Sequence, residues 1–277
     1  MKYREADIIQ ALKMRILSSL KSHNKLSLKE ISLMSGFSVK HTQELFFKQN
    51  GITIGKYIKQ CQFSKAIILL VLTRKSILNI SLDAGYSSQQ SFSRAFKKEF
   101  SLTPMKYRKR GIIDTQKIIS EFQSGNKFIY YGEFFLDSIK TRSVLIRFTD
   151  SVLSPANIIS KNKRLQKIKS SLSRDDSILI VSSIIPIKNE TLKIHIKSFF
   201  CSPAEVGEEI STISGVYYKI KFNGSLEDYI NMGRNIIFYI KIPFSLEIIE
   251  DIKKNGDEFD ITIFIPKERS KKGSKNR

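Results

Sequence analysis

The chain has 277 residues, enough for two domains with separate cores, and its 41% of hydrophobic residues excludes a disordered chain. Its formal net charge is +21, and residues 1–110 carry most of it, with 21 Lys/Arg against 6 Asp/Glu. Residues 111–265 are nearly balanced, with 20 Lys/Arg against 19 Asp/Glu, so the basic first part favours a phosphate-rich partner over charge that serves solubility alone.

A first helix-turn-helix is predicted over residues 27–50. Ser27 and Glu30 have the spacing of a capping box and begin a short helix, which Gly36 ends. A second helix is predicted over residues 38–49, with one apolar face turned inward. The inward-facing residues are Thr42, Leu45 and Phe46.

Two longer helices are predicted around this unit, over residues 6–20 and 53–72, because apolar residues recur in them at helical spacing. The second long helix is expected to hold the first helix-turn-helix at a fixed separation from the unit that follows. Its apolar side consists of Ile54, Tyr57, Ile58, Phe63, Ile67, Leu70 and Val71.

Residues 76–100 repeat the layout of residues 27–50 with a different sequence. Gly85 permits the reversal between two helices, and Ser88 is placed to cap the second helix. A buried stripe is predicted at every fourth residue, formed by Phe92, Phe96 and Phe100. A solvated amphipathic helix is the alternative interpretation, and the repetition of the unit favours DNA reading over it.

The run from Ala84 to Arg108, AGYSSQQSFSRAFKKEFSLTPMKYR, resembles the signature of the AraC/XylS family of bacterial transcription regulators. The resemblance covers residues 6–110. It implies an all-α DNA-binding domain over residues 1–110, whose two recognition helices enter successive major grooves about 34 Å apart.

The resemblance also implies which positions contact bases and phosphates. They are Lys40, Gln43 and Glu44 in the first unit, and Gln89, Gln90, Ser91, Arg94 and Lys97 in the second. Gln suits adenine, Arg suits guanine or phosphate, and Ser suits phosphate. Members of the family tend to carry an aromatic residue at the position of Lys40 and a basic residue at the position of Glu44, so the base preference of the first unit is open.

Beyond a predicted connector over residues 111–126, the pattern becomes one of strands and helices. Two strand–helix–strand sets in succession indicate a pseudo-duplicated α+β domain over residues 127–266, followed by a basic tail over residues 267–277. The predicted strands cover 128–135, 144–148, 177–185, 192–200, 216–222 and 259–265, and the predicted helices cover 157–172 and 225–239.

The segments GVYYKIKFNG at 215–224 and DITIFIP at 260–266 resemble the GyrI-like effector domain. The order of the two domains is that of the Rob-type members of the AraC/XylS family. The resemblance implies an aromatic-lined cleft with a buried carboxylate for cationic ligands. The candidate ligand-binding residues are Tyr217, Tyr218, Phe222, Tyr239 and Glu250, and core packing with one solvated acid is the alternative.

Other classes of function have little support in the sequence. Cys61 and Cys201 are too few for a disulfide framework and indicate a reducing compartment. The three histidines lack metal-ligand spacing, and no nucleophile–base–acid set is evident, so we expect no metal, no cofactor and no enzymatic activity. The apolar runs are too short for a bilayer span, and the start is too charged for a signal peptide. We therefore expect a cytoplasmic protein with no membrane partner.

The sequence thus predicts a DNA-binding transcription regulator, an activator, that binds duplex DNA as a monomer in the nucleoid. Its C-terminal domain is expected to sense a small apolar or cationic effector, and RNA polymerase is a further candidate partner. Two alternatives for the C-terminal domain remain open. One is a protein-interaction module without a ligand, and the other is a hydrolase-like enzyme domain, as in some relatives of the effector fold.

Overall fold

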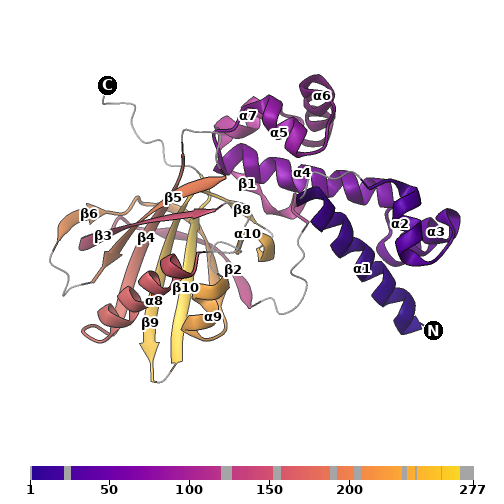
Figure 1. Ribbon diagram of the computed structural model, residues 1–277. Coiled ribbons are helices and arrows are strands. Elements are labelled where there is room, and N and C mark those ends of the chain that lie inside the picture. Colours follow the sequence, from indigo (N-terminus) through magenta and orange to yellow (C-terminus); the bar gives the residue numbers. More distant parts are fainter. Residues whose placement is uncertain are drawn as a thin grey trace. The chain divides into compact units, whose positions relative to one another are not determined.

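The structure, a computed structural model, describes residues 2–21, 26–119, 127–151, 157–187, 192–202, 207–232, 236–240, 242–256 and 258–268. The chain divides into two compact units (Figure 1). The first, helical unit consists of Met1–Leu70, Lys75–Lys106 and Lys117–Glu121. The second, sheet unit consists of Val71–Arg74, Tyr107–Gln116 and Phe122–Arg277.

The helices predicted over residues 6–20, 27–50, 53–72 and 76–100 are confirmed by the helices before residue 111. They are α1 (Lys2–Lys21), α2 (Leu28–Ser35), α3 (Val39–Asn50), α4 (Ile54–Leu72), α5 (Ile77–Asp83), α6 (Gln89–Phe100) and α7 (Pro104–Arg110). Helix α4 has the pair α2–α3 near one end and the pair α5–α6 near the other (Figure 1). Its 19 residues make it about 28 Å long at 1.5 Å per residue.

The helix caps of the two pairs follow one plan. The capping box predicted at the start of α2 is present, since Ser27 and Glu30 each bond the other's backbone N–H. Ser38 caps α3 by accepting a hydrogen bond from the His41 N–H, as Ser88 caps α6 by accepting one from the Ser91 N–H. The reversal within each pair uses a glycine in the left-handed region, Gly36 with φ 72° and Gly85 with φ 81°.

The ends of α3 and α6 also correspond. Gly51 follows α3 with φ 67°, and Ser101 follows α6 with φ 57°. Each is followed two residues later by a threonine, Thr53 or Thr103, whose hydroxyl accepts a hydrogen bond from the backbone of the next helix. Ser101 is the one non-glycine residue with positive φ among the described residues, so the second repeat places a side chain where the first repeat has none.

Aromatic packing holds the second pair against α4. Phe92 and Phe96 are fully buried, and Phe100 continues the predicted stripe. The Phe63 ring of α4 lies 5.9 Å from the Phe96 ring and 5.4 Å from the Phe100 ring, both edge to face. The first pair packs on α4 through Phe46, which is fully buried and 5.4 Å from the ring of Tyr57. These contacts fix the rotation of α3 and α6 about their axes.

The sheet unit contains an antiparallel sheet of eight strands in the order β2-β7-β10-β9-β4-β5-β3-β6, and a separate pair, β1-β8. The strands are β1 (Ile113–Asp114), β2 (Phe128–Leu136), β3 (Lys140–Ser151), β4 (Ser177–Pro186), β5 (Lys193–Cys201), β6 (Glu208–Ser211), β7 (Gly215–Phe222), β8 (Pro243–Phe244), β9 (Glu247–Asn255) and β10 (Glu258–Pro266). Its helices are η1 (Thr115–Lys117, a 3-10 helix), α8 (Ile158–Leu172), α9 (Leu226–Met232) and α10 (Ile236–Tyr239). Helices α8 and α9 pack against the same face of the sheet (Figure 1).

The six predicted strands and the helix predicted over 157–172 are confirmed, although β3 is much longer than predicted. The single helix predicted over 225–239 corresponds to α9 and α10, on either side of residues 233–235, which lie outside the described residues. Strands β1, β6, β8 and β9 were not predicted. The predicted connector contains β1 and η1, and its residues 120–126 lie outside the described residues, as do residues 269–277 of the predicted tail.

The two faces of the eight-stranded sheet differ in what covers them. Antiparallel partners lie on the same face, so the register sorts the side chains. Ile180, Glu250 and Ile263 are neighbours on the face that α8 and α9 cover. Val181 and Ile249 are neighbours on the opposite face.

Candidate nucleic-acid interface

Helix α6 presents a polar surface on the side away from its buried phenylalanine stripe. Gln89, Gln90, Arg94 and Lys97 are exposed, as DNA-contacting residues must be. Ser91 is half-buried, and its hydroxyl donates to the Ser88 carbonyl at 2.9 Å. Of the positions that the family resemblance suggested in this helix, the structure therefore brings four onto the surface and places the fifth within the helix cap.

Helix α3 presents the corresponding surface of the first pair. Thr42, Leu45 and Phe46 are buried, as predicted, and the Thr42 hydroxyl lies 2.7 Å from that of Ser35 on α2. The three suggested contact residues, Lys40, Gln43 and Glu44, are all exposed.

The N-caps Ser38 and Ser88 align the two helices position by position. On this alignment Lys40 corresponds to Gln90, Glu44 to Arg94, and Phe47 to Lys97. Phe47 was not among the positions that the family resemblance suggested, yet its side chain is 54% exposed on the same surface as Glu44. Its spacing of three residues from Glu44 was the available signal, since residues three apart share a helix face. The surface of α3 thus carries a carboxylate and an aromatic ring where that of α6 carries two cations.

A partly buried ion pair joins the end of α5 to the segment that links α4 and α5. Lys75 forms an ion pair with Asp83, the last residue of α5, and both side chains are about 15% exposed. Burial lowers the pKa of nearby Lys65 on α4, and the charge of Asp83 partly opposes that shift. Asp83 lies directly before the turn that leads into α6, so the ion pair holds the start of that turn.

The candidate ligand residues of the sheet unit fall on two faces. Tyr218, Phe222 and Glu250 lie on the face covered by α8 and α9, and Tyr217 lies on the opposite face. The side chain of Tyr239 lies outside the described residues.

Glu250 is 1% exposed and already has a cationic partner within the chain. Arg164 of α8 and the hydroxyl of Tyr229 on α9 both donate to its Oε1. Burial and the Glu250 charge raise the pKa of Tyr229 well above its usual range, while the pKa of Arg164 is raised because its contact with Glu250 outweighs its burial. The buried carboxylate that the resemblance suggested therefore holds two helices on the sheet.

Two further features bear on the class of protein. Among the described residues, no group of three or more His, Cys, Asp or Glu side chains could hold a metal ion. Within the same part of the chain, no helix combines the length and the apolar character needed to cross a membrane.

A basic unit with two capped helix-turn-helix pairs defines the class as a helix-turn-helix DNA-binding protein. Comparison with known proteins agrees, since residues 31–110 match the family described as "Helix-turn-helix domain". The chain is 30% identical over 254 residues to the F1 operon positive regulatory protein of Yersinia pestis, covering 84% of this chain and 79% of that protein. It is 44% identical over 84 residues to the transcriptional regulator Rob of Salmonella typhimurium, covering 30% of this chain and 29% of that protein.

A solved structure, the C-terminal domain of the response regulator AraT from Geobacillus stearothermophilus, shares 25% identity and covers 42% of this chain and 91% of that chain, with a TM-score of 0.35. The chain belongs to the AraC/XylS family of transcription regulators, which confirms the resemblance found in the sequence. These relatives are named as regulators, in agreement with the expectation that the chain is not an enzyme.

Proposed function

We propose that α3 and α6 are two recognition helices that enter successive major grooves of one duplex. The equivalence of their caps supports this, because it gives both helices the same exposed face. The length of α4, about 28 Å, is close to the groove repeat of about 34 Å. The contacting residues of this proposal are Lys40, Gln43, Glu44, Gln89, Gln90, Ser91, Arg94 and Lys97.

Salt dependence of DNA binding by the full chain tests the electrostatic part of this proposal. With 21 Lys/Arg against 6 Asp/Glu in residues 1–110, we expect the logarithm of the binding constant to fall linearly with that of the salt concentration. The expected slope is about −0.9 for each phosphate neutralised. Binding that is independent of salt, or no binding at low salt by a folded chain, would contradict the proposal.

The direction of regulation and the partners are part of the same proposal. The chain activates transcription, binds its site as a monomer in the cytoplasm and contacts RNA polymerase. The relative from Yersinia pestis, of which this chain covers 79%, is named as a positive regulator, and this supports activation. Transcription from a selected site with purified polymerase tests it, and a lower yield of transcript in the presence of the chain would reverse the sign.

The domain division is also proposed, with DNA binding over residues 1–110, a connector over 111–126, a GyrI-like effector domain over 127–266 and a basic tail over 267–277. In this proposal the effector domain senses a small apolar or cationic ligand. Two adjoining cavities in the sheet unit support ligand sensing over the alternative of a ligand-free interaction module. The test is whether a ligand that raises the melting temperature of the full chain also changes its affinity for DNA.

A further inference from the structure

The two edges of the eight-stranded sheet differ in length and in chemistry. At one edge, β6 has four residues, of which Glu208 and Glu209 are charged. At the other edge, β2 has nine residues, and Glu133 is its one charged residue. Natural sheets keep their edges short or charged, because an open edge offers unpaired backbone groups to another strand. By this rule β6 is protected against pairing, whereas β2 invites it.

Strand β2 exposes large apolar side chains on both faces of the sheet. Five of them are between 40% and 66% exposed, namely Ile129, Tyr130, Tyr131, Phe134 and Phe135. Such a concentration of exposed apolar side chains marks an interaction surface. Aromatic side chains offer roughly 150–250 Å² each, so the exposed parts of four rings in two copies amount to on the order of 800 Å². With the paired backbone this area approaches the lower limit for a stable interface, about 1,200 Å².

The contacts of these rings within the chain come from the inner neighbour of β2, strand β7. The Lys219 ammonium lies 4.5 Å from the centre of the Phe134 ring, and the Lys221 ammonium lies 5.5 Å from the centre of the Tyr131 ring. On the side of β2 away from β7, no further strand is paired with it in the part of the chain that the structure describes. The outer edge of β2 is therefore the side on which a partner strand fits.

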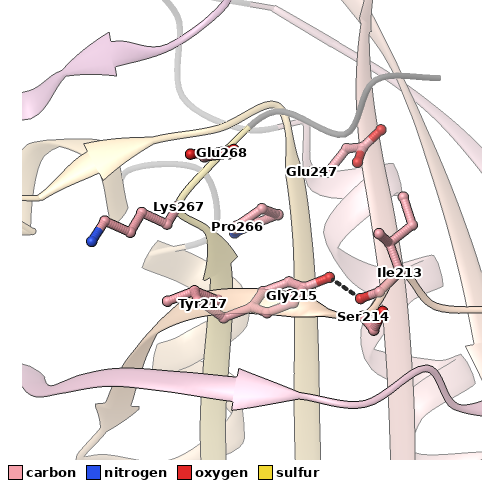
Figure 2. Close-up of a pocket in the computed structure, with 9 residues that line it drawn as sticks. Ile213, Ser214, Gly215, Tyr217, Glu247, Pro266, Lys267 and Glu268 are labelled. Carbon is pink, nitrogen blue, oxygen red and sulfur yellow. Dashed lines mark hydrogen bonds between the residues drawn. The ribbon is translucent and has the colours of Figure 1, made fainter.

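The one charge of β2 already has a partner. The Lys267 ammonium donates to the Glu133 carboxylate at 2.8 Å. Figure 2 shows the side chain of Lys267 extending away from Ile213 and Glu247. Because Glu133 is paired with a cation of its own chain, two copies can bring their β2 edges together without placing two unbalanced carboxylates in contact.

A β-bulge gives β2 the same alternation of faces from both ends. Its register on β7 shifts between Tyr130 and Gly132, and Gly132 has a φ of 106°. Tyr130 before the bulge and Glu133 after it consequently lie on the same, helix-covered face, because they pair with Ile220 and Tyr218.

This alternation makes the strand complementary to a second copy of itself. In an antiparallel pair related by a two-fold axis, residues opposite each other lie on the same face of the sheet. Pairing Tyr130 with Glu133 of a second copy meets this condition. The neighbouring pairs then meet it too, with Ile129 opposite Phe134 on the uncovered face and Phe128 opposite Phe135 on the helix-covered face.

We propose that β2 is an interaction surface for a second copy of this chain, which adds its own β2 in antiparallel orientation and joins the two sheets across a two-fold axis. The pairing goes beyond the proposed function and does not rest on it. One chain still reads one DNA site, because β2 belongs to the sheet unit and each copy keeps its own α3 and α6.

Sedimentation equilibrium of the full chain tests the pairing. We expect a monomer–dimer equilibrium with a dissociation constant on the order of 10 μM, because the area is at the lower limit for stable complexes. A chain that remains monomeric up to about 100 μM would overturn the proposal. Assemblies larger than a dimer would overturn it as well, since a two-fold pairing closes on itself.

Two variants locate the surface. Phe135→Lys is expected to raise the dissociation constant about tenfold or more, because it removes a ring from the interface and adds a charge to the edge. Ile159→Lys is the matched control, since Ile159 on α8 is 71% exposed and lies outside β2, and it should leave the equilibrium unchanged. Equal weakening by both variants, or by neither, would refute the assignment to β2.

The register is tested at Tyr130, which faces Glu133 of the second copy. Tyr130→Glu places like charges opposite each other, and Tyr130→Arg places opposite charges there, twice in each dimer. We expect Tyr130→Glu to raise the dissociation constant about tenfold more than Tyr130→Arg does. Equal effects of the two changes would refute this register. If a variant does not fold, the concentration dependence of the unaltered chain decides whether the pairing exists.

Discussion

The two helix-turn-helix pairs have the same backbone plan and different surface chemistry. Their caps and buried positions correspond, yet Glu44 and Phe47 of α3 stand where α6 has Arg94 and Lys97. Local backbone signals therefore determine where each of these helices begins and ends, and the exposed residues determine the chemistry of its surface. The comparison predicts that the pairs contribute similarly to stability and unequally to DNA binding.

The largest expected effect tests whether the pairs are structurally equivalent. Phe46→Ala and Phe96→Ala should each lower the free energy of unfolding by about 3–5 kcal/mol, because both rings are fully buried at equivalent positions. Phe47→Ala is the matched control, and its exposed ring should cost less than about 0.5 kcal/mol. Urea denaturation of the full chain measures all three, and a loss in only one of the two core variants would break the equivalence.

The next effect concerns α6 alone. Arg94→Ala and Gln90→Ala should each weaken binding to a selected site by about 1–3 kcal/mol, if the side chain makes a bidentate contact to a base. Unchanged binding by both test variants would show that α6 does not read DNA.

Glu44 tests the surface of α3 in the same way, because it is the one carboxylate in residues 31–82. If it faces phosphate, Glu44→Arg should tighten binding to all duplexes by roughly tenfold or less and steepen the salt slope by about 0.9. Binding to the selected site and to shuffled DNA measures the effect. A loss confined to the selected site would show instead that Glu44 accepts from a base, and no change on either DNA would mean that α3 hardly engages it.

The parts of the fold that the sequence predicted are those whose signals act between residues close together in the chain. The helical pairs were predictable because Ser27, Gly36 and Ser88 act within a few residues of their own positions. Strand β9 was not predicted because its charged residues interrupt the alternation of apolar and polar residues that indicates a strand. The pairing of Glu250 with Arg164, 86 residues away, is set by the order of the strands, which no local pattern encodes.

The candidate sites divide in the same way. The exposed residues of α6 could be predicted from the family signature together with the phenylalanine stripe. The role of Glu250 could not, because its contacts with Arg164 and Tyr229 depend on which face of β9 the helices α8 and α9 cover.

A smaller effect is expected at the N-caps of α2 and α5, which should differ in how their contribution to stability depends on pH. Ser27→Ala should cost about 1 kcal/mol, and so should Ser76→Ala at the start of α5. Hydrogen bonds from the Ser27 backbone and hydroxyl lower the pKa of Glu30. The stability that these two bonds to the Glu30 carboxylate contribute is therefore present above the unfolded pKa of about 4.3 and is lost as the pH falls below it. Asn79 occupies the corresponding position of α5 and does not titrate.

Unfolding of both cap variants at pH 7 and near pH 3 measures this difference. The penalty of Ser27→Ala should shrink in acid, whereas that of Ser76→Ala should persist. The same acid dependence for both variants would show that the Glu30 carboxylate has no part in it.

The smallest effect lies at the C-terminal ends of α3 and α6. Ser101→Gly should stabilise the protein by up to about 1 kcal/mol, because φ of 57° is unfavourable for a residue with a side chain. The reciprocal change Gly51→Ser should destabilise it by a similar amount. Both are measured by thermal unfolding, and a stabilising Gly51→Ser would contradict the assigned equivalence.

The most direct test of the central claim is methylation-interference mapping of major-groove guanines on a selected site, using the full chain. The account predicts two interfering segments about one helical turn apart, one for α3 and one for α6. In Arg94→Ala the interference should be lost from one segment only. A single segment in the unaltered chain would contradict the claim that both helices read DNA and would leave α6 as the sole reader.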